Sequence, residues 1–160
     1  MNATSAPPSA ASRRAWMAVL ARASRAELEA ALTAALAGAA APAFDWLRPP
    51  QTGLAMVRGR IGGTGNAFNL GEATVTRATL RLAGAEGGTV GVACHLGRDK
   101  RRAELAALAD ALLQQPARHA RLHAQLIAPL AAREAVRREE RRADTASTKV
   151  EFFTMVRGDA

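Results

Sequence analysis

Residues 52–82 read TGLAMVRGRIGGTGNAFNLGEATVTRATLRL, and this stretch decides the fold. Residues 54–61 alternate as the two faces of a β-strand do, and residues 73–82 are a second strand-like run rich in Thr and Val. The glycines of residues 62–66 permit positive φ and predict a turn between them. One face of the first strand carries Leu54, Met56, Arg58 and Arg60.

Two further strands complete the predicted sheet. Residues 44–47 predict a short strand that Pro49 and Pro50 stop, because proline has no backbone N–H to donate. Residues 90–96 predict a strand after a second glycine-containing turn. All of these connections are too short for parallel crossovers, so the sequence predicts an antiparallel meander of four strands.

The residues before the sheet predict a helical hairpin. Residues 13–23 repeat apolar side chains at helical spacing. Ser24 and Glu27 then form a capping-box pattern at the start of a second helix. Residues 1–12 are rich in Ser, Pro and Ala and predict a disordered lead-in.

The residues after the sheet return to helical periodicity. Asp99 is a good N-cap for a helix that Pro116 ends, and further helices follow. Residues 133–142 mix Arg and Glu and predict a solvated helix laced by i,i+4 ion pairs. Residues 148–156 predict a final β-strand. The fold class is therefore α+β: an N-terminal helical hairpin, an antiparallel β-meander, C-terminal helices and a final strand, in one domain over residues 13–160.

Composition narrows the class of protein. The formal charge is +8, but almost all of the basic residues are Arg beside abundant Ala, which indicates coding bias rather than a basic binding surface. The single cysteine, Cys94, excludes an internal disulfide, and no segment approaches the ~20 apolar residues of a membrane span. We expect a cytoplasmic protein without a membrane or nucleic-acid partner.

Arginines on the predicted sheet are candidates for binding an anion or a partner protein. Arg58 and Arg60 share one strand face, and Arg77 and Arg81 share a face of the next long strand. If the two strands pair, the four guanidinium groups project from one side, where they could bind phosphate oxygens or a partner's carboxylates. The alternative is a solvated face in which Arg replaces Lys.

Two neighbouring features extend this set of candidates. Thr64 lies in the glycine turn, whose backbone N–H groups could form an anion-binding nest, although a plain hairpin turn explains the same glycines. Arg98 directly precedes a predicted helix N-terminus, where a cation is unfavourable, so we expect it to pair with an anionic group.

The remaining motifs predict no catalytic site. Cys94 and His95 are adjacent in a strand and point to opposite faces, so they cannot act as a nucleophile and its base; Cys94 is expected in the core. His119 and His123 have helical i,i+4 spacing but no third ligand nearby, which predicts a surface pair and no metal site. The glycine turn lacks the lysine of a phosphate-binding loop. The catalytic residues remain unknown.

Five blocks of this sequence resemble the PhnG family, a small subunit of the bacterial carbon–phosphorus lyase system. RRAWMAVLARA at residues 13–23 is similar to the family's opening pattern. The other blocks follow in family order; they are residues 52–82, LGRDKRRAELAALADALLQQ at residues 96–115, LIAPL at residues 126–130, and TKVEFFTMVRGD at residues 148–159.

The resemblance implies a function that composition does not. Members of the family act with PhnH, PhnI and the ATPase-like PhnL to displace adenine from MgATP with an alkylphosphonate, forming α-D-ribose 1-methylphosphonate 5-triphosphate. They assemble with PhnH, PhnI and the radical enzyme PhnJ into a hetero-oligomer. The resemblance therefore implies a non-autonomous transferase subunit in organic phosphonate catabolism. This chain would bind no cofactor of its own, and MgATP would be a substrate of the complex.

The C-terminal block is the expected docking segment, because a β-prone chain end is a natural edge for pairing with a partner chain. Its docking candidates are Phe152, Phe153, Met155 and Arg157. Two other functions stay open on the sequence alone. One is a stand-alone nucleic-acid-binding module of high pI, and the other is a stand-alone nucleotide enzyme that uses the glycine turn.

Overall fold

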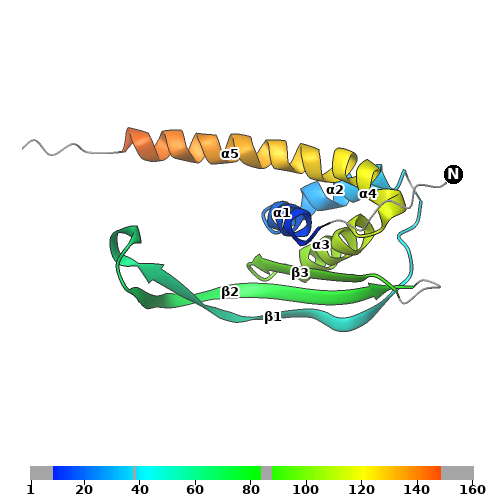
Figure 1. The fold of residues 1–160 in the computed structure, drawn as a ribbon, viewed down its shortest axis with the longest axis horizontal. Helices are drawn as coiled ribbons and strands as arrows, with labels where there is room; N and C mark the ends of the chain where they lie inside the picture. The colour runs from blue at the N-terminus through cyan, green and yellow to red at the C-terminus, as the bar shows by residue number, and fades with distance from the viewer. Residues whose placement is uncertain (1–8, 38, 84–87, 149–160) are drawn as a thin grey trace, which may run out of the picture.

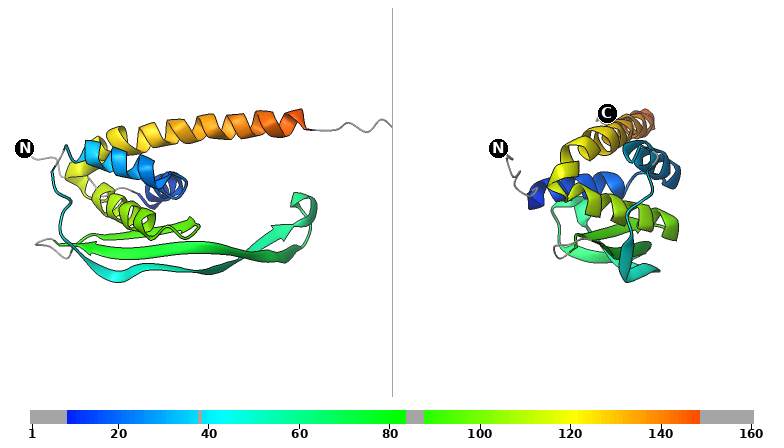
Figure 2. Two further views of the ribbon diagram at one scale, coloured as in Figure 1. Left: turned by 180° about the vertical axis from the view of Figure 1, so that it is seen from behind. Right: turned by 90° about the vertical axis from the view of Figure 1, so that its right-hand side faces the viewer.

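The protein has two layers, with helices packed on one face of a three-stranded antiparallel sheet (Figures 1 and 2). The computed structural model describes residues 9–37, 39–83 and 88–148. The strands, in spatial order, are β1 (Phe44–Arg60), β2 (Ala67–Leu82) and β3 (Val90–Leu96). The helices are α1 (Ala10–Leu20), α2 (Arg25–Ala35), α3 (Lys100–Leu113), α4 (Pro116–Leu122) and α5 (Ala128–Ser147). The predicted α+β class is thus confirmed.

The prediction of four strands is wrong in one respect, because Pro49 and Pro50 do not stop a strand. β1 runs through them from Phe44 to Arg60. It is an edge strand, so one side of its backbone needs no ladder partner, and proline is tolerated there. The pairing with β2 shifts register on both sides of Arg48, which accommodates the prolines. Of the final strand predicted at residues 148–156, Thr148 is the C-cap of α5, and the rest lies outside the described residues.

Side-chain caps set the starts of three helices. Ser9 accepts the backbone N–H of Ser12, so α1 begins at Ala10, and residues 10–12 of the predicted lead-in are helical. Both hydrogen bonds of the predicted capping box between Ser24 and Glu27 are present in α2. Asp99 caps α3 as predicted, by accepting the backbone N–H of Arg102.

The core lies between α3 and the sheet. α3 is the most buried helix, and it packs on β3 where Gly91 passes directly beneath it. A methyl group at Gly91 would overlap the backbone carbonyl oxygen of Ala107, so only glycine allows this close approach. The same approach fixes which face of β3 turns inward, namely the face of Gly91, Ala93 and His95.

A buried carboxylate joins the helical layer to the sheet. Asp110 of α3 is fully buried. Its Oδ1 accepts the indole Nε1–H of Trp16 at 2.9 Å, and its Oδ2 accepts the backbone N–H of Val92 at 2.9 Å. The guanidinium of Arg13 donates Nη2–H to Oδ2 at 2.7 Å and Nε–H to Oδ1 at 3.2 Å. One side chain therefore holds α1, α3 and β3 together, and its charge is paired where it is withdrawn from water.

Replacing Asp110 is expected to destabilise the fold strongly. Asp110→Ala leaves the indole N–H and the amide of Val92 without acceptors, and it removes the partner of Arg13. The free energy of unfolding should fall by about 3 kcal/mol. Urea denaturation monitored by circular dichroism measures this change. Asp144→Ala on the exposed part of α5 is the control, with an expected change within about 0.5 kcal/mol; equal midpoints for the two variants would contradict the role of Asp110.

Candidate functional site

The most distinctive feature of the molecule is a two-stranded arm that extends past the rest of the sheet. β3 ends at Leu96, opposite Val75 of β2, whereas β1 and β2 continue together for the length of the arm. We define the arm as residues 52–74. Figures 1 and 2 show it projecting beyond α1, α2, α3 and α4, on the same side of the molecule as the far end of α5.

The arm begins at a defined polar contact. The hydroxyl of Thr76 is buried and donates to the carbonyl oxygen of Gly97 at 2.7 Å, and it lies 3.1 Å from the hydroxyl of Thr52. The N–H of Gly97 donates to the carbonyl of Thr74 at 2.9 Å. Gly97 has φ +102°, a conformation that turns the chain out of the sheet and that glycine adopts without strain. The third strand therefore stops at the base of the arm.

Large apolar side chains are exposed along the arm. Their exposed fractions lie between 40% and 75%, and they are Leu54, Met56, Val57, Ile61, Phe68 and Leu70. Phe68 covers part of its neighbour strand, since its ring lies 3.6 Å from the position that a Cβ would take on Gly59. Large apolar side chains that stay exposed together on one element indicate an interaction site. Sequence alternation alone could not find it, because a strand whose apolar face stays exposed has the same pattern as one whose apolar face packs on the core.

The arm closes in a glycine turn, as predicted. Gly62 and Gly63 have φ of 61° and 81°, which only glycine adopts readily, and the N–H of Gly65 donates to the carbonyl of Ile61 at 2.9 Å. Arg60 stabilises the turn by donating Nη1–H to the carbonyl of Gly65 at 2.9 Å. Thr64 is exposed at the tip. Whether its turn binds an anion stays a prediction.

The four sheet arginines do not form one face, so that prediction is wrong. Arg77 and Arg81 pair across the sheet with Gln51 and Asp45, whereas Arg58 and Arg60 pair with residues near the turn. Arg58 lies seven positions after Gln51 along β1, which is about 23 Å of strand. The pair Arg77 and Arg81 and the pair Arg58 and Arg60 also lie on different faces of the sheet. Arg77 and Arg81 alternate with side chains that face the core, while strand alternation puts Arg58 and Arg60 on the face of Leu54 and Met56.

Arg98 is exposed beside the base of the arm, just after the turn at Gly97. No ion pair of Arg98 is found within the residues that the structure describes, so its predicted anionic partner is not among them. The docking candidates Phe152, Phe153, Met155 and Arg157 lie outside the described residues.

The cysteine and histidines have structural explanations. Cys94 is exposed rather than in the core, which corrects the sequence prediction. The reason is that Gly91 must face α3, and alternation then turns Cys94 outward and His95 inward. The ring nitrogens of His95 lie 2.9 Å and 3.0 Å from the carbonyl oxygens of Leu96 and Asp99. His119 contacts the carbonyl of Leu113 through Nδ1 at 2.8 Å.

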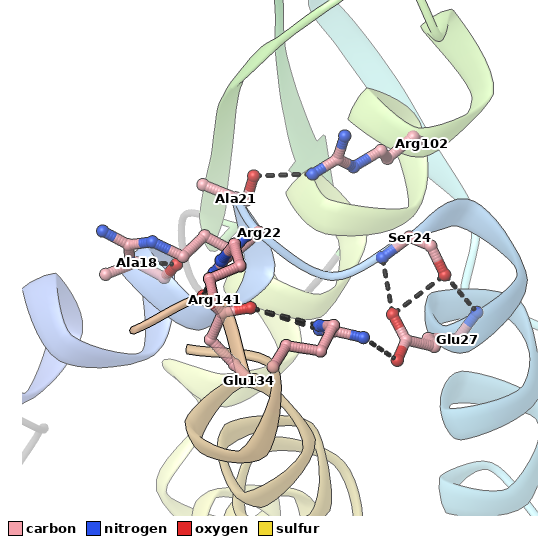
Figure 3. A network of polar contacts seen from close by, with 9 residues as sticks. Ala18, Ala21, Arg22, Ser24, Glu27, Arg102, Glu134 and Arg141 are labelled. Carbon is pink, nitrogen blue, oxygen red and sulfur yellow. Dashed lines mark hydrogen bonds and ion pairs between the residues drawn. The ribbon is translucent and has the colours of Figure 1, made fainter. Parts of the chain in front are cut away.

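A polar network fixes the base of α5 on the helical layer (Figure 3). Arg137 of α5 donates to Glu27 of α2 at 2.7 Å and to Glu134 at 3.3 Å, and Arg141 also donates to Glu134, at 3.2 Å. Ion pairs are present on this helix, but the predicted i,i+4 spacing is wrong: they have i,i+3 and i,i+7 spacing, and one reaches α2. The carboxylate of Glu27 accepts the backbone N–H of Ser24, and this bond, aided by Arg137, lowers its pKa to about 2.

No constellation for metal binding or membrane insertion is found in the described ranges. They contain no group of three or more His, Cys, Asp or Glu side chains placed to hold a metal ion. None of their helices is both long enough and apolar enough to cross a bilayer. Together, the fold and the arm define a class of protein: a small α+β domain with a stable body and an uncovered apolar ribbon suited to protein–protein contact.

Comparison with known proteins identifies the family. The profile of the family described as "Phosphonate metabolism protein PhnG" matches residues 11–158. A protein of Rhizobium meliloti (strain 1021), named alpha-D-ribose 1-methylphosphonate 5-triphosphate synthase subunit PhnG, is 49% identical over 156 residues, which cover 98% of this chain and 96% of the relative. This chain belongs to the PhnG family.

The charge of Glu27 is expected to make stability depend on pH. Because the pKa of Glu27 is lowered from 4.5 to about 2 in the fold, its charge stabilises the native state above pH 4.5, and this stabilisation is lost as the pH falls toward 2. Glu27→Gln should therefore lower the free energy of unfolding by about 1 kcal/mol at neutral pH. Urea denaturation of both proteins across this pH range measures the difference.

The difference between wild type and Glu27→Gln should shrink steadily below pH 4.5. Glu140→Gln, which changes an exposed carboxylate on α5, is the control and should match wild type throughout. A difference that stays constant down to the lowest pH tested would show that the charge of Glu27 is not the stabilising feature.

Proposed function

We propose that this chain is a subunit of an α-D-ribose 1-methylphosphonate 5-triphosphate synthase, acting in the catabolism of organic phosphonates. The observation that carries the proposal is the 49% identity to a named subunit of this synthase, extending over nearly the full length of both chains. Similarity of this extent covers the body and the arm alike, so it supports the same role rather than a shared fold alone.

The subunit is proposed to bring no complete active site of its own. Adenine displacement requires a polarised sugar carbon, an oriented phosphonate and stabilisation of the leaving base, which calls for several convergent polar groups. In the described part of the chain, every buried polar side chain is occupied by internal hydrogen bonds or ion pairs; they are Thr76, His95, Asp110 and Glu134. The sheet arginines lie in two separate pairs; Arg81 lies across from Asp45, whereas Arg58 and Arg60 lie across from Asn69 and Ala67, so the four do not converge on one point with an acid and a base.

Its proposed partners are the PhnH-, PhnI- and PhnJ-like subunits, with a PhnL-like protein for the synthase reaction. MgATP and the alkylphosphonate are substrates of that assembly, which we place in the cytoplasm. The alternative of a stand-alone nucleic-acid-binding module receives no support. The sheet arginines do not form a continuous basic surface, and the arginines of α5 are interleaved with glutamates that pair with them.

Co-expression tests this proposal. The tagged chain is produced with the PhnH-, PhnI- and PhnJ-like proteins of the same genome and purified by the tag. Native mass spectrometry then measures the mass of the intact complex. We expect a stable hetero-oligomer. With the PhnL-like protein and methylphosphonate added, it should release adenine from MgATP.

The matched control is the same mixture without this chain, which should release no adenine above background. Purification of the chain with none of these partners bound would contradict its role as a subunit. Adenine release by the isolated chain would contradict the absence of a self-contained active site.

A further inference from the structure

We propose that the arm is the element through which this subunit docks on another subunit of the synthase, by covering its apolar side chains and pairing Arg58 and Arg60 with carboxylates of that partner. This inference rests on the proposed function and adds to it the surface and the chemistry of the contact. It concerns residues 52–74, and it leaves the body of the domain free to fold alone.

The first step is that the arm lacks the support that a β-ribbon needs. β3 ends level with Gly53, and residues 54–60 of β1 extend for about 23 Å beyond it. A two-stranded ribbon is only marginally stable in water, and a third strand or a packed helix is normally required. Here α1–α4 lie over the body, and Leu54 and Met56 remain 64% and 52% exposed.

The second step is that both strand edges of the arm are open for pairing. β1 is the edge strand of the sheet, and β2 loses its neighbour at Val75, where β3 ends. Natural proteins protect such edges with proline, charge or a covering element. Pro49 and Pro50 lie before the arm, and residues 52–74 contain no proline. The charges of Arg58 and Arg60 and a register shift between Val57 and Arg58 are the protection that the arm has. Its apolar side chains nevertheless stay exposed, which indicates an arm that is covered in its working state.

The third step identifies the chemistry of the occupant. Among the described residues, Arg58 and Arg60 form no ion pair, and strand alternation places them on the same face as Leu54 and Met56. A surface that covers this face must offer apolar side chains to the two hydrophobic residues and carboxylates to the two guanidinium groups. Self-association would instead bring together two chains that each have a net charge of +8, and it would place Arg58 and Arg60 of both copies in the contact. A different, carboxylate-bearing subunit fits better than a second copy.

The apolar part of the contact is tested with Leu54→Asp combined with Met56→Asp. The affinity of the chain for the co-expressed PhnH-, PhnI- and PhnJ-like subunits should fall at least about tenfold, because buried apolar anchors dominate interface energies. Val136→Asp on α5 is the matched control, since Val136 is 58% exposed but lies outside the arm; its affinity should equal that of wild type. All three side chains are exposed, so the thermal midpoints of the isolated chains should agree.

The charged part is tested with Arg58→Glu combined with Arg60→Glu. This variant should also bind the partner subunits at least about tenfold more weakly. The control is Arg138→Glu with Arg142→Glu, which makes the same change of charge at exposed positions of α5. An equal loss in the variants of α5, or no loss in those of the arm, would overturn the proposal.

Hydrogen exchange of the wild-type chain, alone and in the assembled complex, gives a readout that needs no substitution. Amides of residues 52–60 and 67–74 should exchange at least about tenfold more slowly in the complex. Unchanged exchange in the arm of an assembled complex would overturn the inference while leaving the proposed function standing. Failure of the wild-type chain to assemble would overturn both. A homodimer of the isolated chain that Leu54→Asp with Met56→Asp dissociates would assign the arm to a second copy and so overturn the choice of partner.

Discussion

The structure depends on one buried carboxylate. Asp110 accepts hydrogen bonds from the side chains of Arg13 and Trp16 and from the backbone of Val92, and so links the first helix, the central helix and the last strand. A carboxylate without such donors would be strongly unfavourable in the core. With them it fixes how α1 sits on α3 and how α3 sits on the sheet. Trp16 also lies against the ring of His119, at 5.4 Å between centroids, which ties α4 to the same centre.

The stable body explains why an uncovered arm can exist at all. The hydrogen bonds of Asp110 and the packing of α3 over Gly91 hold the half of the sheet that contains β3. At Gly97 the chain leaves the sheet, and the remaining length of β1 and β2 carries apolar side chains that stay exposed, although α5 extends on the same side of the molecule (Figure 1). In this arrangement, the residues of the body stabilise the fold, and the exposed residues of the arm are the ones proposed to bind the partner. Substitutions in the arm can change assembly while the body keeps its stability, which agrees with the proposed role in a multi-subunit synthase.

Local rules succeeded where the stabilising contact is local. The capping box of Ser24 and Glu27, the cap of Asp99 and the glycine turn at the tip each involve residues within a few positions of one another, and each was predicted. Pro49 and Pro50 were misjudged because the effect of a proline depends on whether its strand is an edge, which is a property of the sheet. Cys94 was misjudged because strand alternation defines two faces but not which of them turns inward. The sequence named the candidate arginines, whose role stays a prediction, but it did not show the register that separates them.

By itself, the sequence determined the α+β class, the order of helices and strands, and, through its resemblance and its extended similarity to a known subunit, the PhnG family. These follow from periodicity, caps and motifs that can be read along the chain. Only the tertiary structure decided that Asp110 is the central contact, since the donors that reach it from α1 and β3 lie 18 to 97 positions away. It alone also decided that Leu54, Met56 and Leu70 are exposed, because exposure depends on where β3 and the helices end relative to a strand that continues beyond them.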